Sequence, residues 1–297
     1  MITFAFLSHH SKELILPMVE KIISYNLNIP IIIIENSQDL TLKKELEEKY
    51  KQSVKVYIPS ENLGFSKGMN KAVELSETDF IFLNPADVIL PLNCIKGLLE
   101  CVNNFDDFTL LAPTYEDGSV HENYVSNLFS NNNETKKKFY LQEKFSLREV
   151  DWIDGTFIVN KKKINTTKIM DENIFIYFET MDMCYNFKKN KHKMYVIDNL
   201  KFTHLGGQSH NKKYDFEAHL SRNWHYNWSK FYYFRKNKSY FYALRKFLTI
   251  IPKILVKIMI FKIKGHKKEY ELCKAELLGS LNSILLRSSY YRPYLKK

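Results

Sequence analysis

SENLGFSKGMN, residues 60–70, is the stretch that decides the fold. It lies between two strand-like runs, Ser53–Ile58 and Asp79–Leu83, and directly before an expected helix over Lys71–Ser76. Glycine lets backbone amides approach a ligand closely, a helix N-terminus favours negative charge, and asparagine both donates and accepts hydrogen bonds. A polar loop that only caps a helix would need one glycine or one asparagine. Two of each with a lysine favour a binding loop.

Strands and helices alternate on both sides of this stretch. The apolar run Thr3–Leu7 precedes an amphipathic helix over Leu14–Tyr25. Pro30–Ile34 is almost entirely β-branched, which is typical of a strand buried on both faces of a parallel sheet. A charged helix then runs to Tyr50. This alternation predicts an α/β fold with a mostly parallel sheet.

Polar clusters follow three of these strands, at Ser8–Ser11, Glu35–Ser37 and Asn84–Asp87. In parallel sheets, ligands bind at the carboxyl ends of the strands. The coincidence predicts a nucleotide site at that edge of the sheet. Taken alone, Glu35 is equally consistent with a solvated strand end.

Composition limits the classes of function. The 297 residues suit one sizeable α/β domain with an appendage or two small domains, and the net charge of +11 indicates an anionic partner. The four cysteines form no C-x-x-C pair, which argues against a zinc cluster or a disulfide framework and fits a reducing cytoplasm. We expect no secretory leader. Without a G-x-G-x-x-G or Walker loop, dinucleotide redox chemistry and P-loop hydrolysis are disfavoured.

Asn62-Leu63-Gly64-Phe65, followed by Gly68 and Asn70, resembles the N-x-G-F-…-N signature of family 2 glycosyltransferases, in particular their rhamnosyltransferase-like branch. The resemblance extends over most of residues 1–210. It implies the GT-A (nucleotide-diphospho-sugar transferase) fold, a Rossmann-like, mostly parallel sheet. It also implies that the signature loop lies against the sugar-diphosphate of the donor and that Glu35 faces the base edge. The donor-binding residues expected on this basis are Ser8, Glu35, Asn36, Asn62, Gly64, Phe65, Lys67, Gly68, Asn70 and Asn84.

The segment Phe82–Val88 corresponds to the metal-binding D-x-D turn of that family, usually L-N-P-D at this place. This chain departs from the pattern because its clear carboxylate, Asp87, comes one place later. A divalent cation, Mg²⁺ or Mn²⁺, takes oxygen ligands and shares the diphosphate oxygens. His204 opens a stretch similar to the terminal H-x-x-G-x-S element, residues 204–209, and would complete the metal shell or touch the diphosphate. A turn capped by Asn84-Pro85 and a structural histidine are the alternatives.

The acceptor half of the site is expected further along. Asp151–Val159 resembles the W-x-x-G-A strand that walls the acceptor, with Trp152, Asp154 and Gly155 as its contacts. Met170–Cys184 resembles the F-D-E-x-F-F-x-Y-x-E-D-x-D-L block, whose acids begin a helix to about Lys189.

An inverting transfer needs a carboxylate that takes the proton from the acceptor hydroxyl. Thr180 replaces the usual second acid of the pair and cannot be a base, so Glu179 is the expected base. Asp182 is the second choice, or a structural acid that faces the helix. Capping of the helix is the alternative for Glu179, and we interpret Asp171 and Glu172 as turn caps.

Two connecting regions are less informative. Pro91–Phe108 is expected to be a helix. Residues 115–149 are polar and low in aliphatic content, with the run Asn131–Asn133, and predict a mobile loop or lid.

The C-terminal region changes character. From Arg222 the sequence is helical, aromatic and lysine-rich, and Phe247–Ile263 is apolar but carries lysines that make it a poor transmembrane helix. The lysines that share one helical face are Lys246, Lys253, Lys257, Lys264 and Lys268. This is the pattern of an interfacial helix on anionic lipid, and packing on the catalytic domain or across a homodimer is the alternative. A further amphipathic helix is expected over Tyr270–Leu286.

The sequence thus predicts a catalytic domain over residues 1–221 and a helical, basic, membrane-associating region over 222–297. The expected function is inverting transfer of a sugar, with rhamnose as one candidate, from a nucleotide-diphosphate donor to a glycan or lipid-linked glycan. We place it in bacterial surface polysaccharide synthesis, in the cytoplasm at the inner membrane face. We expect no nucleic-acid partner, and a homo-oligomer is left open. A degenerate GT-A protein and a nucleic-acid-binding protein are the alternatives. A sugar-1-phosphate nucleotidyltransferase is disfavoured because Ser8–Ser11 lacks glycine.

Overall fold

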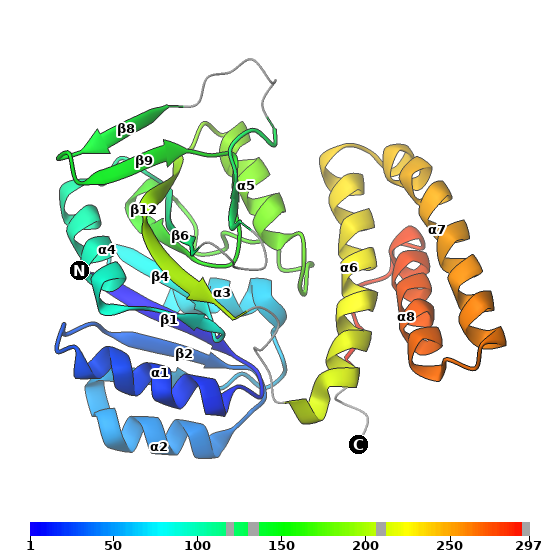
Figure 1. Cartoon of the computed structure of the whole chain (residues 1–297), viewed down its shortest axis with the longest axis horizontal. Helices are drawn as coiled ribbons and strands as arrows, with labels where there is room; N and C mark the ends of the chain where they lie inside the picture. The colour runs from blue at the N-terminus through cyan, green and yellow to red at the C-terminus, as the bar shows by residue number, and fades with distance from the viewer. Residues whose placement is uncertain (117–121, 130–136, 206–211, 293–297) are drawn as a thin grey trace. The chain divides into compact units, whose positions relative to one another are not determined.

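The computed structural model describes residues 1–116, 122–129, 137–205 and 212–292. The chain divides into two compact units (Figure 1). The first comprises Met1–Met170 and Met183–Asn211, and the second comprises Asp171–Asp182 and Lys212–Lys297.

The first unit is built on a ten-stranded sheet with the order β3-β2-β1-β4-β11-β6-β12-β9-β8, to which β5 is added through β12. Its strands are β1 Ile2–Ser8, β2 Ile31–Glu35, β3 Val54–Tyr57, β4 Phe80–Pro85, β5 Val88–Ile89, β6 Leu110–Tyr115, β8 Lys138–Leu141, β9 Phe145–Glu149, β11 Phe157–Asn160 and β12 Met194–His204. A separate pair joins β7 Tyr124–Val125 to β10 Trp152–Ile153. Strands β1 to β4, β6 and β12 run in one direction. The mixed, mostly parallel sheet confirms the predicted fold class.

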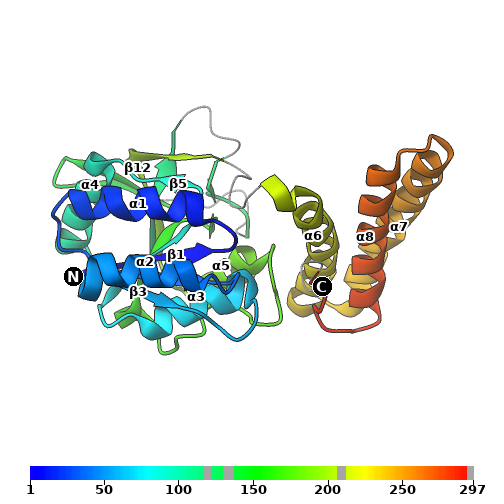
Figure 2. The same ribbon diagram turned by 90° about the horizontal axis from the view of Figure 1, so that it is seen from below.

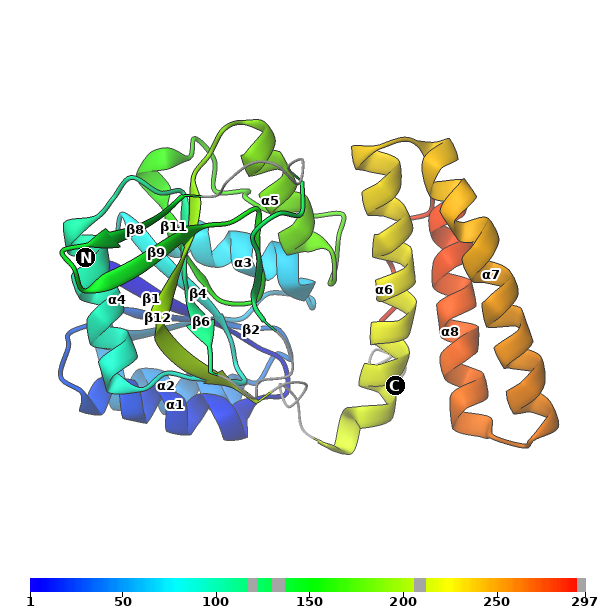
Figure 3. The ribbon, with the colours of Figure 1, turned by 45° about the horizontal axis from the view of Figure 1, so that its top comes forward.

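Helices cover both faces of this sheet (Figures 1 and 3). One face carries α1 Lys12–Ser24, α2 Leu40–Tyr50 and α4 Leu92–Asn104, and the other carries α3 Gly64–Leu75 and α5 Glu179–Lys189. Every residue of β2 is buried, as its β-branched sequence predicts for a strand between two helical layers. Short 3₁₀ helices occupy Lys51–Ser53, Lys161–Lys163 and Lys212–Tyr214.

Three expected boundaries were wrong. The helix expected over Lys71–Ser76 begins at Gly64. Most of residues 60–70, which we call the signature stretch, is therefore helical and not loop. The helix expected over Pro91–Phe108 ends at Asn104. The segment 138–149, expected within a loop, forms the antiparallel β8–β9 hairpin at the edge of the sheet, where Phe145 and Leu147 are buried. Residues 117–121 and 130–136 of the expected lid lie outside the described residues.

The second unit contains three long helices, α6 Asp215–Asn237, α7 Tyr240–Ile263 and α8 Lys267–Ile284, lying side by side (Figures 1 and 2). Helix α8 approaches α6 so closely that a Cβ atom on Gly279 would lie 2.1 Å from the backbone oxygen of Trp224. Across the part of the chain that the structure describes, no helix combines the length and the apolar character needed to cross a bilayer.

A buried histidine ties the chain after α8 to α6. Nε2 of His225 lies 2.8 Å from the backbone oxygen of Tyr291, and Nδ1 lies 3.0 Å from Oγ of Ser289. A neutral ring that donates from Nε2 to the carbonyl satisfies both contacts. Burial lowers the pKa of His225 to about 3, and the positive charge of Arg292 lowers it further. The hydrogen bond to Tyr291 acts in the opposite direction.

Candidate active site

The sheet topology gathers most of the predicted site residues of the first unit at one edge. Ser8 and Glu35, the last residues of β1 and β2, are register partners. Strand β11 runs antiparallel to β4 and pairs Phe157 with Leu83, so the turn before β11 meets the end of β4. The pairing of Val88 with His204 brings β5 to the end of β12. The carboxyl ends of the parallel strands thus define the site, as expected for open α/β sheets.

Glu35 is 1% exposed, and its carboxylate is only half satisfied by the protein. Oε1 accepts a hydrogen bond of 2.7 Å from the backbone N–H of Ser37 and another from its hydroxyl. Within the described residues, Oε2 of Glu35 and the hydroxyls of Ser8 and Ser66 are buried and have no hydrogen-bond partner. Because unsatisfied buried polar atoms are costly, such atoms at a strand end indicate a place where a ligand donates.

Asn36 bonds the signature stretch to the end of β2. Its side chain is buried, with an exposed fraction of 3% for the residue. Oδ1 of Asn36 accepts from the N–H of Leu63 at 3.2 Å, and its Nδ2 donates to the backbone oxygen of Gly64 at 3.1 Å. Asn62 in turn accepts from the N–H of Gly64 at 2.9 Å, and Gly64 enters α3 with φ of 71°. These bonds fix the polar turn beside Glu35.

His9 is a residue of this cluster that we did not predict. Its Nε2 lies 3.4 Å from Nδ2 of Asn62, and its ring packs against that of His10 at 4.5 Å. The backbone N–H of His10 donates to Oγ of Ser37 at 3.0 Å, and His10 has a left-handed φ of 54°. Two histidines directly after a buried strand were the available signal.

The remaining signature residues divide between packing and exposure. A Cβ on Gly68 would lie 2.5 Å from Cδ1 of Leu7, so this glycine lets α3 approach β1. The Asn70 side chain donates to the oxygen of Met170 at 2.9 Å and accepts from its N–H at 3.0 Å. Asn70 therefore fixes the backbone at Met170, the first residue of the stretch Met170–Cys184, which we call the acidic block. Phe65 packs against the core, and Lys67 is exposed.

Asp87 and His204 lie together, as the expected metal site requires. Oδ2 of Asp87 is 3.5 Å from Nε2 of His204, and Asp87 is 4% exposed. One carboxylate oxygen and one imidazole nitrogen at this distance fit a shared cation such as Mn²⁺. No group of three His, Cys, Asp or Glu side chains with metal-binding geometry occurs in the described ranges. Diphosphate and water oxygens would have to complete the shell. Residues 206–209 of the expected H-x-x-G-x-S element lie outside the described residues.

Tyr115, which sequence reasoning missed, connects the metal pair to the acceptor segment. Its ring lies 4.9 Å from that of His204. A Cβ on Gly155, whose φ is 72°, would lie 2.8 Å from the Tyr115 hydroxyl. Burial raises the pKa of Tyr115 well above its usual range, and the charges of Asp154 and Asp87 add to the effect. A tyrosine that ends an apolar strand gives no signal in sequence.

The predicted acceptor residues lie where β10 gives way to β11. Half-buried Trp152 pairs with Val125 in the β10–β7 ladder, and the N–H of Asp154 donates to the oxygen of Asn123 at 2.8 Å. The hydroxyl of Thr156 donates to Oδ1 of Asn84 at 2.9 Å. The Asn84 side chain therefore joins the acceptor turn to the end of β4.

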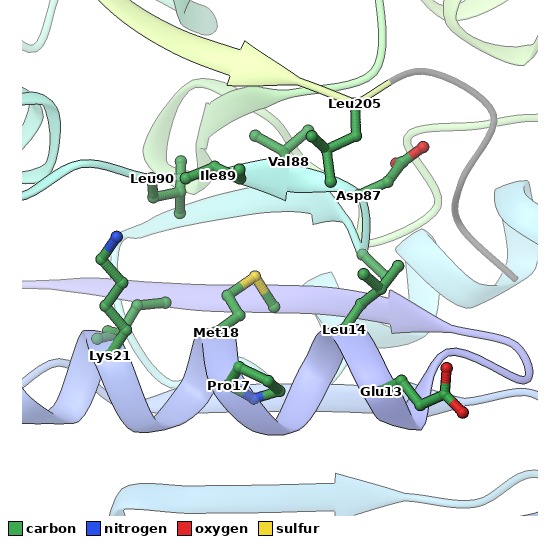
Figure 4. Close-up of a pocket in the computed structure, with 12 residues that line it drawn as sticks. Glu13, Leu14, Pro17, Met18, Lys21, Asp87, Val88, Ile89, Leu90 and Leu205 are labelled. Atoms are coloured by element: carbon green, nitrogen blue, oxygen red, sulfur yellow. The ribbon is translucent and has the colours of Figure 1, made fainter. Parts of the chain in front are cut away.

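An apolar groove borders Asp87 on the side of α1 (Figure 4). Its volume is about 310 Å³, and Leu14, Met18, Val88 and Leu90 are among the side chains that line it. An apolar lining suits hydrocarbon and not a diphosphate. The polar cluster around Glu35 is therefore the better candidate for a nucleotide.

The part of the acidic block that belongs to the second unit, Asp171–Asp182, contains a strained turn just before Glu179. Tyr177 and Phe178 both have left-handed backbones, with φ of 69° and 65°. Each such residue costs about 1–3 kcal/mol, so the turn persists only where its surroundings hold it. Oγ of Ser229 donates to the oxygen of Ile176 at 2.9 Å, and the Phe178 ring lies 5.6 Å from that of Tyr233. Helix α6 thus braces the turn.

The two candidate bases differ in their surroundings. Glu179 is the first residue of α5 and is 6% exposed. Asp182 is 1% exposed and lies 2.6 Å from Nζ of Lys236, and its Oδ1 accepts from Nδ2 of Asn237 at 2.7 Å. Asp182 is therefore engaged by α6 in a structural ion pair.

Lys236 also contacts Asp171, with Nζ 2.7 Å from Oδ2. Burial opposes ionisation of Asp171, but bonds from Lys236, the N–H of Asn173 and Tyr232 hold its pKa below the usual range. Burial likewise opposes the charge of Lys236, yet its two carboxylate partners keep its pKa above the usual value. The interpretation of Asp171 as a turn cap describes only part of its role. Asp171 does bond the N–H of Asn173, at 2.9 Å, and it also fixes α6.

Comparison with known proteins agrees with this fold. Residues 5–167, more than half of the chain, match the family described as Glycosyl transferase family 2. A search of curated protein sequences found no significant match.

Solved structures share the fold at low identity. The mannosyltransferase PcManGT from Pyrobaculum calidifontis, in complex with GDP-Man and Mn²⁺, is 7% identical with a TM-score of 0.53 over 95% of this chain and 86% of its own. TarS 1-349 from S. aureus is 13% identical with a TM-score of 0.51 over 98% and 93%. GalNAc-T7 with UDP, GalNAc and Mn²⁺ is 13% identical with a TM-score of 0.52 over 69% of this chain, which spans 43% of that protein.

The sheet order and these structural neighbours define a fold of the GT-A type. The chain belongs to glycosyltransferase family 2.

Proposed function

We propose that the chain transfers a sugar from a nucleotide-diphosphate donor to a glycan acceptor with inversion at the anomeric carbon. The observation that carries the proposal is the cluster at the ends of β1 and β2. There, the buried Oε2 of Glu35 and the hydroxyl of Ser8 lack partners among the described residues, beside the turn that Asn36 fixes. Glu35 would accept from the base or the ribose, and Asn62 and the amides of the signature turn would face the sugar-diphosphate.

The donor class is supported by the family and by the ligands of structural neighbours. These neighbours were solved with GDP-Man, with UDP and GalNAc, and, for TarS 1-349, with UDP-GlcNAc. A rhamnose donor is proposed on the sequence resemblance of the signature stretch. Asp87 and His204 would hold a divalent cation, which supplies positive charge against the charge that develops on the leaving diphosphate.

Glu179 is the proposed general base. Its side chain is buried, and it stands at the start of α5 directly after the strained Tyr177–Phe178 turn. Glu179 would take the proton from the acceptor hydroxyl as that oxygen attacks the anomeric carbon, and the nucleotide leaves as its diphosphate. Asp182 is the weaker candidate because Lys236 and Asn237 already bind it. Trp152, Asp154 and Gly155 would line the acceptor side of the site.

We further propose that the acceptor is a lipid-linked glycan of bacterial surface polysaccharide synthesis. The protein would then act in the cytoplasm, peripherally at the inner face of the cytoplasmic membrane. The basic charge of the C-terminal helices supports this placement, because a lipid-linked acceptor is presented at an anionic surface. Residues 1–221 would form the catalytic domain, and residues 222–297 would bring it to that surface.

A nucleotide-sugar screen tests the activity. We expect one of UDP-GlcNAc, UDP-GalNAc, GDP-mannose or dTDP-rhamnose to raise the melting temperature, and more so with Mn²⁺ or Mg²⁺. Glu179→Gln should keep donor binding and lose transfer, whereas Glu172→Gln, a matched change in the same block, should keep both. Equal transfer by the wild type and Glu179→Gln would refute the assigned base. Donor binding without hydrolysis or transfer to any acceptor would favour a degenerate GT-A protein.

A further inference from the structure

Helix α7 carries apolar side chains on two faces, and its own unit covers only one of them. Ala243, Phe247 and Ile254 are buried, and they face the core that contains Phe231 of α6. Phe241, Leu248, Leu255, Met259 and Ile263 recur at spacings of seven, seven, four and four, which places them along another side of the helix. We call these five residues the α7 stripe.

The α7 stripe is strongly exposed. The exposed fractions run from 46% for Leu255 through 60% for Met259 to 86% for Ile263. Val256 and Ile260, next to the stripe, are 50% and 42% exposed. Large apolar side chains that are exposed all along one side of a 24-residue helix are unusual for a face that meets only water.

The charges of this helix identify its partner. Residues 240–268 contain no aspartate or glutamate and eight basic residues: Arg245, Lys246, Lys253, Lys257, Lys262, Lys264, Lys267 and Lys268. Lys246, Lys253, Lys257 and Lys264 recur at seven, four and seven and are all exposed, so they form a row along one flank of the stripe. Long lysine side chains can extend their ammonium groups to the headgroups while the apolar stripe enters the lipid.

We propose that the α7 stripe is a lipid-inserting face, on which α7 lies in the plane of an anionic bilayer. A second copy of the chain fits less well. A two-fold contact through this face would bring two lysine-rich helices together without an acidic side chain on either one. An anionic leaflet supplies both the apolar interior and the negative charge. The inference specifies the membrane association proposed above, naming its helix and its side chains.

Vesicle sedimentation of the full chain tests the proposal. We expect the wild type to pellet with phosphatidylglycerol–phosphatidylcholine vesicles at low salt and much less with phosphatidylcholine alone. The variant Leu255→Glu/Met259→Glu should lower the partition coefficient at least tenfold. Leu40→Glu, which places the same side chain at an exposed leucine of the first unit, should bind like the wild type. Lys253→Gln/Lys257→Gln should remove most of the dependence on phosphatidylglycerol.

Three results would overturn the inference. The wild type could stay in the supernatant with anionic vesicles, or the variant Leu255→Glu/Met259→Glu could pellet like the wild type. Sedimentation equilibrium could also show a wild-type dimer that this variant abolishes. Because the substituted positions are exposed, Leu255→Glu/Met259→Glu and Lys253→Gln/Lys257→Gln should both keep the wild-type melting temperature. Both should also keep the shift of that temperature with nucleotide-sugar. Vesicle binding is measured without donor, so failure of the transferase proposal leaves this result unaffected, and the reverse also holds.

Discussion

Replacement of Glu35 by glutamine is the sharpest test of the donor site. The carboxylate is buried, with Oε1 held by the N–H and the hydroxyl of Ser37 and Oε2 facing the proposed ligand. Glutamine offers one acceptor oxygen and one NH₂ group. If its oxygen keeps the bond to Ser37, the NH₂ group faces the donor groups of the ligand. If it is turned round, the NH₂ group faces the N–H of Ser37. In either orientation, two hydrogen-bond donors face each other and one bond is lost.

The size of the effect follows from the bond that is lost. A hydrogen bond to a charged group contributes about 1.5–3 kcal/mol, and about 1.4 kcal/mol corresponds to a tenfold change in affinity. We therefore expect Glu35→Gln to weaken nucleotide binding by roughly 10- to 150-fold. Because the base and ribose contacts do not involve the metal, the loss should be similar with and without Mn²⁺.

Isothermal titration with UDP and with GDP measures this loss. Glu61→Gln is the matched control, since Glu61 lies in the signature stretch and is exposed. It should bind like the wild type. Chemical denaturation of Glu35→Gln shows whether the fold is intact, so that weaker binding is not confused with unfolding. Equal affinities of a folded Glu35→Gln and the wild type for both nucleotides would refute the reasoning.

Four further predictions concern the metal pair and the second unit. Asp87→Asn should reduce the gain in UDP affinity that Mn²⁺ gives, measured by titration with and without the ion; an unchanged gain would exclude Asp87 as a ligand. His225 has a pKa of about 3 when folded and about 6.5 when unfolded, so its neutral form stabilises the fold fully above pH 6.5, and this stability is lost as the pH falls toward 3. Between pH 6.5 and 5 the loss should reach about 2 kcal/mol in guanidinium titrations, and His225→Gln should show a shallower fall. Lys236→Met leaves buried Asp182 and half-buried Asp171 without their cation and should cost about 3 kcal/mol at pH 7. Because the pKa of Asp171 is held below its usual value, this cost should shrink only as the pH falls below about 4, and an equal cost at pH 7 and about pH 2 would contradict the ion pair. Gly279→Ala should destabilise by about 1–3 kcal/mol despite the better helix propensity of alanine, because the new methyl group meets the backbone of Trp224; a more stable variant would show that α6 and α8 can separate cheaply.

The sheet was predictable because its strands carry an unambiguous signal. An unbroken β-branched run such as that of β2 indicates burial on both faces, and the polar residues that follow each strand mark the ligand edge. The hairpin of β8 and β9 was missed because an edge strand exposes alternate residues. The exposed side chains of Lys138 and Tyr140 gave this segment the composition of a loop.

The signature stretch shows where sequence reasoning stops. Its asparagines and glycines indicate a ligand loop, yet Gly68 permits the approach of Leu7 and Asn70 binds the backbone of Met170, a hundred residues away. Such roles depend on tertiary neighbours that local chemistry does not reveal. Tyr115 was missed for the same reason, since its importance lies in what surrounds its hydroxyl.

The division of the chain at Met170, Asp182 and Asn211 means that the polypeptide passes between its two units three times. The C-terminal helices therefore do not form a separate module, because their partner segment, Asp171–Asp182, ends 30 residues before Lys212 and lies within the transferase sequence. A gene truncated after Asn211 would leave the proposed base on a strained turn without Ser229 and Tyr233 to support it. Recombination that exchanges these helices between relatives should succeed only when the upstream dodecapeptide travels with them.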